Sequence, residues 1–230
     1  MTWSETTRPA DGSGRSTLLV PLGATEQHGP HLPLATDTLI ARAWAEAVAD
    51  RLPAAVVAPA LPFGSSGEHQ GFAGTLSIGG PALRLVVVEL ARSAAETFDR
   101  LVLLSGHAGN LGPLTEAADQ LRYEGHDVID LVPTWPAGRG FAVDAHAGRT
   151  ETSLLLHLHP ELVRLELAEP GRTDDLAELI ERLMAEGVRA VAANGVLGDP
   201  TGASAEEGRR LFGDLVDRTV DTIGQAIDRR

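Results

Sequence analysis

The 230-residue sequence contains no cysteine and no lysine. Without cysteine there is no disulfide framework and no thiolate chemistry, so histidines and carboxylates must supply the ligands of any metal site. Without lysine, a phosphate-binding P-loop is excluded. Long apolar segments are also missing, and none approaches the roughly 18 uncharged residues that a membrane-spanning helix needs. We therefore expect no membrane partner.

Basic residues are few, with 19 arginines against 32 acidic residues and a net charge of −13. Phosphate backbones require a basic face, so nucleic acid is not expected as a partner. Hydrophobic residues make up 43% of the chain, enough for the core of one α/β domain. We expect a flexible N-terminus at residues 1–16, which are polar and unlike a signal peptide, and a single domain at 17–230. Such a chain is expected in the cytoplasm.

Short apolar runs alternate along the chain with longer segments of helical periodicity. This alternation predicts a mostly parallel sheet covered by helices on both faces. Asp37 stands at the start of one predicted helix, where it is able to cap it. Pro160 is expected to break another. The strands are expected at 17–23, 54–61, 100–106 and 126–132, and the helices at 37–52, 81–98, 111–125, 151–163, 174–188 and 204–229.

Polar side chains follow each of the predicted strands. Ligands of open parallel sheets bind beyond the carboxyl ends of the strands, so these side chains should meet at one edge. The segments are PLGATEQHGPHLPLATDT (21–38), GSSGEHQGFAGT (64–75), SGHAGN (105–110) and DAHAGRTETS (144–153). The residues expected there are Glu26, His28, Asp37, Glu68, His69, His107, Asp144, His146 and Glu151.

Two histidines and three carboxylates at one edge are typical of a two-metal site for divalent zinc, manganese or iron. Glu26 and His28 are two residues apart, so in an extended segment their side chains lie on one side. Two such ions can hydrolyse an amide, and a nearby histidine can move a proton to the leaving nitrogen. Each residue also has a plain structural explanation: a polar loop for Glu26 and His28, capping for Asp37, and a favourable helix N-terminus for Glu151.

Five segments together resemble the signature motifs of the creatininase family of metal-dependent amidohydrolases. They are LGATEQHGPHLPLATDT, GSSGEHQGFAGTLSIG, SGHAGN, DAHAGRTETS and GVLGDPTGASAEEGR. The resemblance implies a three-layer α/β/α fold with a mostly parallel sheet, two divalent metal ions per chain, and a ring-like homo-oligomer, a hexamer or an octamer. By motif position it implies Glu26, His28, Asp37 and His107 as metal ligands, with Asp37 bridging the two ions.

The fifth ligand departs from creatininase itself. Creatininase carries a carboxylate two residues after the histidine of the third motif, where this chain has Gly109. The resemblance therefore moves the expected ligand to Glu151. His146 matches the proton-transfer histidine of the family, and Asp144 is expected to orient His146 or to contact substrate.

The missing carboxylate at Gly109 makes creatinine a doubtful substrate. Ala108 and Gly109 are expected to leave room for something larger, and Ser66 and His69 could touch that substrate or only brace their loop. These features resemble a peptidase branch of the family, which removes a C-terminal Val-Tyr dipeptide from a ribosomally made precursor peptide. That branch implies ferrous iron, while the ligand set also suits zinc and allows manganese.

Three alternatives stay open at this point. A small-molecule amidohydrolase of the same family would act on creatinine or a formamide with the same metals. A metal-stabilised binding protein would need metal for stability but show no turnover. A nucleotide-binding domain is disfavoured, because SGHAGN lacks the glycine spacing of a dinucleotide fingerprint. His31 has no assigned role, and we expect it to brace its loop or to support a ligand.

Overall fold

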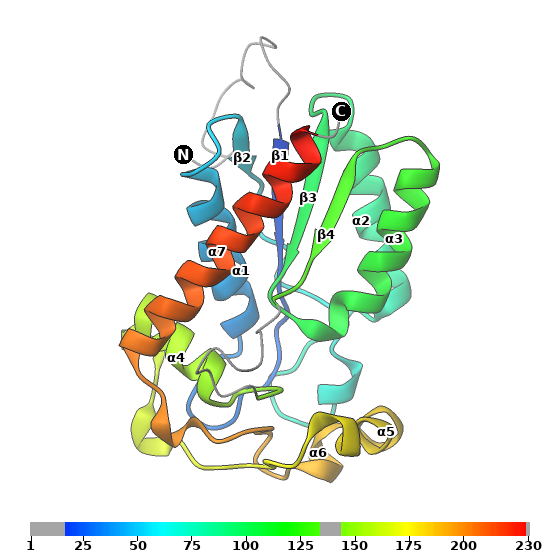
Figure 1. Cartoon of the computed structure of the whole chain (residues 1–230). Helices are drawn as coiled ribbons and strands as arrows, with labels where there is room; N and C mark the ends of the chain where they lie inside the picture. Colours follow the sequence, from blue (N-terminus) through cyan, green and yellow to red (C-terminus); the bar gives the residue numbers. More distant parts are fainter. Residues whose placement is uncertain (1–16, 134–143, 229–230) are drawn as a thin grey trace.

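A computed structural model describes residues 17–133 and 144–228 (Figure 1). The flexible N-terminus expected at 1–16 lies outside the described residues. A parallel sheet of four strands, in the order β2-β1-β3-β4, forms the centre of the described part. Its strands are β1 (Thr17–Leu22), β2 (Ala55–Val57), β3 (Arg100–Ser105) and β4 (Val128–Leu131).

The two central strands are buried along their whole length. β1 reads TLLVPL and β3 reads RLVLLS, and they pair in register from Thr17 with Arg100 to Leu22 with Ser105. Near-continuous apolar runs of this kind are characteristic of parallel strands covered on both faces. Both strands therefore end at the same edge, which we call the carboxyl edge.

The edge strand β2 is shorter than the expected 54–61. Regular pairing ends at Val57, although Ala58 and Leu61 still donate backbone hydrogen bonds to β1. The second of these bonds comes three residues after the first instead of two, so the regular ladder is interrupted between them. An isolated bridge joins Leu61 to Leu22 and keeps the following loop at the carboxyl edge.

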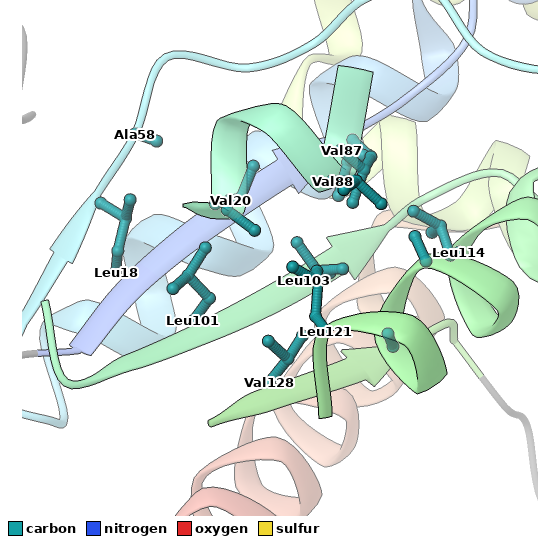
Figure 2. Close-up of a cluster of buried hydrophobic side chains, with 14 of the residues drawn as sticks. Leu18, Val20, Ala58, Val87, Val88, Leu101, Leu103, Leu114, Leu121 and Val128 are labelled. Atoms are coloured by element: carbon teal, nitrogen blue, oxygen red, sulfur yellow. The ribbon is translucent and has the colours of Figure 1, made fainter. Parts of the chain in front are cut away.

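Helices cover both faces of the sheet, and alternate residues of the strands face opposite layers. Leu18, Val20, Leu101 and Leu103 pack against α2 and α3, as Figure 2 shows. The intervening residues pack against α1 and α7. The expected three-layer α/β/α arrangement is confirmed. The covering helices are α1 (Thr36–Ala49), α2 (Gly80–Ala94), α3 (Leu111–Tyr123) and α7 (Ala205–Asp228).

The remaining helices lie towards the carboxyl edge, with α5 and α6 beyond the ends of the strands in Figure 1. The helix expected at 151–163 stops at Leu158, and Pro160 starts a separate turn, as predicted. These helices are α4 (Arg149–Leu158), α5 (Leu176–Glu186) and α6 (Val188–Val191). The short 3-10 turns are η2 (Gly67–His69), η3 (Ala108–Asn110), η4 (Pro160–Leu162), η5 (Leu165–Leu167) and η6 (Pro200–Gly202).

Two local expectations are corrected. Asp37 does not cap α1: Ala35 holds the N-cap position, and Asp37 lies inside the first turn. Its carboxylate is thereby directed at histidines of the carboxyl edge rather than at the helix backbone. The helix expected at 81–98 ends at Ala94. None of the described helices is long and apolar enough to cross a membrane.

Candidate metal centre

The connection between β1 and α1 supplies three of the candidate ligands. Glu26 and His28 follow β1, and Asp37 stands in the first turn of α1, all with their side chains essentially inaccessible to solvent. β3 approaches this turn so closely that a Cβ on Gly106 would lie 2.3 Å from the backbone oxygen of Asp37. Only glycine fits at position 106, and this close approach places the next residue, His107, beside Asp37.

Three histidines each donate one ring N–H to a backbone carbonyl. A carbonyl oxygen only accepts, so each bond fixes which ring nitrogen carries that hydrogen. The other nitrogen then faces the carboxylates, the arrangement usual for histidines that bind metals. The bonds run from His28 Nδ1 to Glu26 (3.2 Å), from His107 Nε2 to Ser65 (3.0 Å) and from His146 Nε2 to Gln27 (2.8 Å).

Asp37 divides its two carboxylate oxygens between two groups of side chains. Oδ2 lies 3.5 Å from Nδ1 of His107, which is itself 3.3 Å from Oε1 of Glu26. Oδ1 lies 3.1 Å from Nε2 of His28, which is 3.8 Å from Oε2 of Glu151. In each group the possible ligand atoms lie within 4.8 Å of one another. The sets are Glu26–Asp37–His107 and His28–Asp37–Glu151. A third set within the same limit, Glu26–His28–His146, does not include Asp37.

Three buried oxygens in this cluster lack hydrogen-bond partners among the described residues. They are both carboxylate oxygens of Glu26 and Oδ2 of Asp37. Leaving buried carboxylate oxygens unpaired is costly, and cations bound by the cluster would remove that cost. The donors are nitrogen and oxygen only, a set that suits zinc, manganese or iron. The residues present therefore fit two divalent ions that share Asp37.

The charges in the cluster follow from burial and from close neighbours. Burial opposes ionisation of Glu26, but His107 and the other histidines outweigh it and hold the pKa of Glu26 well below its usual range. Burial likewise opposes charge on His28 and His107, yet the adjacent carboxylates raise both pKa values to about 10. Burial raises the pKa of Glu151 to about 7. In the metal-free protein, protonated His28 and His107 thus supply the positive charge that bound metal ions would otherwise provide beside the carboxylates.

His146 lies in a strained loop before α4. Ala147 adopts a left-handed conformation, with φ of 52°, and its N–H donates to the carboxylate of Glu151. Backbone strain of this kind is often found at functional sites. Nδ1 of His146 lies 3.7 Å from Oε1 of Glu26, and burial holds the pKa of His146 well below its usual value. His146 is therefore neutral and faces the cluster.

Asp144, expected to orient His146, is engaged elsewhere. Its carboxylate accepts hydrogen bonds from the backbone N–H of Thr150, at the start of α4. Asp144 thereby anchors the helix that carries Glu151, and it also lines the cavity in front of the cluster. The structure gives it a role in placing Glu151 rather than a hydrogen bond to His146.

Gln27 was not singled out from the sequence, although it lies between two candidate ligands. Its amide donates to the backbone oxygen of Gly195 (3.1 Å) and to Nδ1 of His69 (3.0 Å). Because Nδ1 of His69 accepts, Nε2 carries the hydrogen, and it lies 3.3 Å from Oε1 of Glu26. Burial lowers the pKa of His69 to about 4. His69 therefore lies beside Glu26 as a neutral group, and it also lines the cavity.

The loop residues expected to contact substrate are placed differently from one another. Ser66 is fully buried, with Oγ 3.5 Å from Nε2 of His107, and braces its loop. Ala108 and Gly109 line the cavity. A Cβ on Gly109 would lie 2.3 Å from Oε1 of Glu68. Gly109 thus borders the cavity, while the flexible carboxylate of Glu68 and the backbone oxygen of Ser65 lie where a side chain at this position would begin.

His31, which the sequence left without a role, supports α4. Its ring is buried and Nε2 lies 2.9 Å from Oγ1 of Thr152, the residue after Glu151. Burial lowers the pKa of His31 to about 4. The loop after β1 is thus tied to the helix that carries the fifth candidate ligand, as the expected bracing role requires.

A cavity of about 890 Å³ opens in front of the cluster. This volume lies within the range of about 300–1,000 Å³ typical of small-molecule sites. Charged and histidine side chains described above line the cavity, and so do several residues of α5. The cluster is therefore accessible from the cavity although most of its members are buried.

The comparisons with known proteins agree with this geometry. The profile of the creatininase family, described as creatinine amidohydrolase, matches residues 1–223, and the chain belongs to the creatininase family. The mycofactocin precursor peptide peptidase of Mycobacterium ulcerans (strain Agy99) is 50% identical over 217 residues, 91% of this chain and 85% of that protein. The predicted membership of the family is confirmed.

Solved structures of creatininase show the same fold. A crystal structure of creatinine amidohydrolase has a TM-score of 0.76 at 31% identity, covering 93% of this chain and 91% of that one. A structure described as "Creatininase Mn" has a TM-score of 0.76 at 30% identity, and the match covers 93% of this chain and 91% of that one. The predicted fold class is confirmed by these neighbours.

Proposed function

We propose that the chain is a peptidase that uses two divalent metal ions to hydrolyse an amide bond near the C-terminus of a peptide. The observation that carries the proposal is the division of the Asp37 carboxylate between two buried groups of ligand atoms. A carboxylate shared in this way is typical of sites with two ions about 3.5–4 Å apart.

In this proposal Glu26, Asp37 and His107 hold one ion, and His28, Asp37 and Glu151 hold the other. The ions are Fe²⁺ or Zn²⁺, with Mn²⁺ also compatible with the donors. When bound, such ions polarise the carbonyl of the scissile amide and lower the pKa of water. The carbonyl hydrogen bonds described above keep the ring nitrogens of the histidines in the orientation that binding requires.

His146 is proposed to move the proton that the leaving nitrogen needs. Its Nε2–H is committed to the backbone oxygen of Gln27, so Nδ1 is the atom that takes up and returns a proton. The low pKa caused by burial keeps Nδ1 free of hydrogen before reaction. Well-placed general acid–base groups contribute about 10²–10⁴-fold to a rate.

The proposed substrate is the modified mycofactocin precursor peptide, from which a C-terminal Val-Tyr dipeptide is released. Support comes from the peptidase relative and from a cavity larger than a creatinine molecule needs. The second candidate is a small amide such as creatinine or a formamide, favoured by the likeness to creatininase structures. A binding protein without turnover is the third.

One experiment separates the three. The purified protein is analysed for metals and then incubated with a peptide ending in Gly-Val-Tyr, and with creatinine, in the presence of Fe²⁺, Zn²⁺ or Mn²⁺. About two metal ions per chain with release of Val-Tyr supports the peptidase. Two ions with turnover of creatinine alone favours the small-amide enzyme. Two ions with no turnover leaves the binding protein, and failure to bind metal refutes the proposal.

We further propose that the protein acts in the cytoplasm as a homo-oligomer, a hexamer or octamer, without nucleic acid or membrane partners. The net charge of −13 supports the exclusion of nucleic acid. Apolar side chains exposed on α2 and α3, including Leu85 and Tyr123, offer surface for contacts between copies. Light scattering of the purified protein measures the number of subunits.

A further inference from the structure

Helix α5 carries two apolar stripes with different environments. Leu179 and Leu183 are buried and pack with α6 in a small core of their own. Leu176, Ile180 and Met184 recur every four residues, so they lie along one side of the helix. We call these three residues the α5 stripe.

The α5 stripe is exposed although it is apolar. Leu176 is 45% accessible, Ile180 42% and Met184 83%. All three line the cavity in front of the metal cluster, together with Leu183 and Leu197. His107 and Glu151 line the same cavity. A ligand in the cavity can therefore meet polar and apolar side chains at once.

We propose that the α5 stripe is the subsite that recognises apolar or aromatic side chains next to the scissile amide of the substrate peptide. This inference rests on the proposed peptidase function. Successive side chains of an extended peptide point to opposite sides, so a peptide whose amide reaches the carboxylate and histidine side chains can direct flanking side chains towards the α5 stripe. Burying them against Leu176, Ile180 and Met184 removes apolar surface from water on both partners.

The occupant is a substrate rather than a second copy of this chain, because the stripe and the cluster share one cavity. A second copy seated on the stripe would stand in front of the cluster. Other exposed apolar residues are available for assembly away from the cavity, such as Leu85 on α2, which is 63% accessible. Contacts between copies and contacts with substrate therefore have separate surfaces.

The test compares two α5 variants with a matched control. Ile180→Ser and Met184→Ser remove the apolar side chains from the stripe, and Leu85→Ser removes one of similar exposure from another helix. The probes are two fluorescent peptides whose scissile amide is replaced by an uncleavable CH₂–NH group, one ending in Val-Tyr and one in Gly-Gly. Their dissociation constants are measured on the metal-loaded protein, alongside its oligomeric state and its cleavage of the ordinary peptide.

Binding of the Val-Tyr probe should weaken about tenfold in each α5 variant, while the Gly-Gly probe and Leu85→Ser change less than about twofold. The inference is overturned if the α5 variants lose affinity equally for both probes, or lose affinity for neither. It is also overturned if the unaltered protein does not bind the Val-Tyr probe. A changed oligomeric state with unchanged probe binding assigns the stripe to a second copy and also overturns it. Failure of the proposed function is distinct: the ordinary peptide is not cleaved, whatever the probes show.

Discussion

Replacing Gly106 by alanine should separate β3 from α1 and so disperse the metal cluster. The added Cβ would lie 2.3 Å from the backbone oxygen of Asp37 and 3.0 Å from its carbonyl carbon. Ordinary contact needs about 3.4 Å, so the two backbones must part by about 1 Å. Functional sites tolerate displacements of only about 0.5 Å, and Asp37 belongs to two of the three candidate metal groups.

The expected cost is about 2 kcal/mol, typical of overpacking in a close-packed site. In a domain of this size that lowers the melting temperature by about 4–8 °C. Thermal denaturation and elemental analysis of Gly106→Ala measure both effects. Bound metal should fall well below two ions per chain.

Gly112 in α3 provides a matched control. A Cβ there meets no atom within 4 Å, so Gly112→Ala should leave metal content unchanged. Its melting temperature should rise slightly, because alanine favours a helix over glycine by up to about 1 kcal/mol. If Gly106→Ala retained two ions and the melting temperature of the parent protein, the account of Asp37 as the shared ligand would fail.

The remaining predictions concern the ligands and the proton-transfer group. Glu151→Gln should retain about one metal ion per chain, because the group of Glu26, Asp37 and His107 stays intact; loss of both ions would contradict the two separate groups. His146→Ala should retain both ions and lower kcat by about 10²–10⁴-fold, and a kcat near that of the parent would exclude His146 from proton transfer. Metal-free protein should lose stability from about pH 6.5 to pH 10. Folding raises the pKa of His28 and His107 from 6.5 to about 10. The stabilisation is complete below 6.5 and disappears as pH rises through 10. Melting temperatures measured with a chelator present should show that decline, and a flat profile would contradict it.

The layer structure and the meeting of polar segments could be predicted because both follow from local patterns. Buried runs such as TLLVPL and RLVLLS identify parallel strands, and parallel strands share a carboxyl edge. That residues at the ends of these strands lie close together can therefore be predicted without knowing the side-chain geometry. The expectation that Glu26, His28, Asp37 and His107 lie together needs no more than this.

Contacts between loops could not be predicted in the same way. The Gln27 amide reaches His69 and Gly195, which lie 42 and 168 residues further along the chain. Glu68 comes from a different loop, and its carboxylate lies beside Gly109, a contact that neither segment indicates by itself. Whether Asp37 caps its helix depends on where the helix begins, and a shift of one or two residues changes the answer.

The histidines of the site divide into two classes by the number of carboxylates beside them, and this division supports the proposed roles. His28 and His107 each lie within 4 Å of at least two carboxylates, whereas His69 and His146 lie that close to Glu26 alone. Burial alone lowers the pKa of a histidine, and His31, His69 and His146 all show that direction. His28 and His107 are equally hidden from solvent, yet nearby carboxylates reverse the effect and raise both pKa values, Asp37 chiefly for His28 and Glu26 chiefly for His107. Positive charge is thus favoured at two positions only, and these are the two assigned to metal ligands. The same burial that leaves His146 neutral gives it an unprotonated Nδ1, which a proton-transfer group needs before the leaving nitrogen departs.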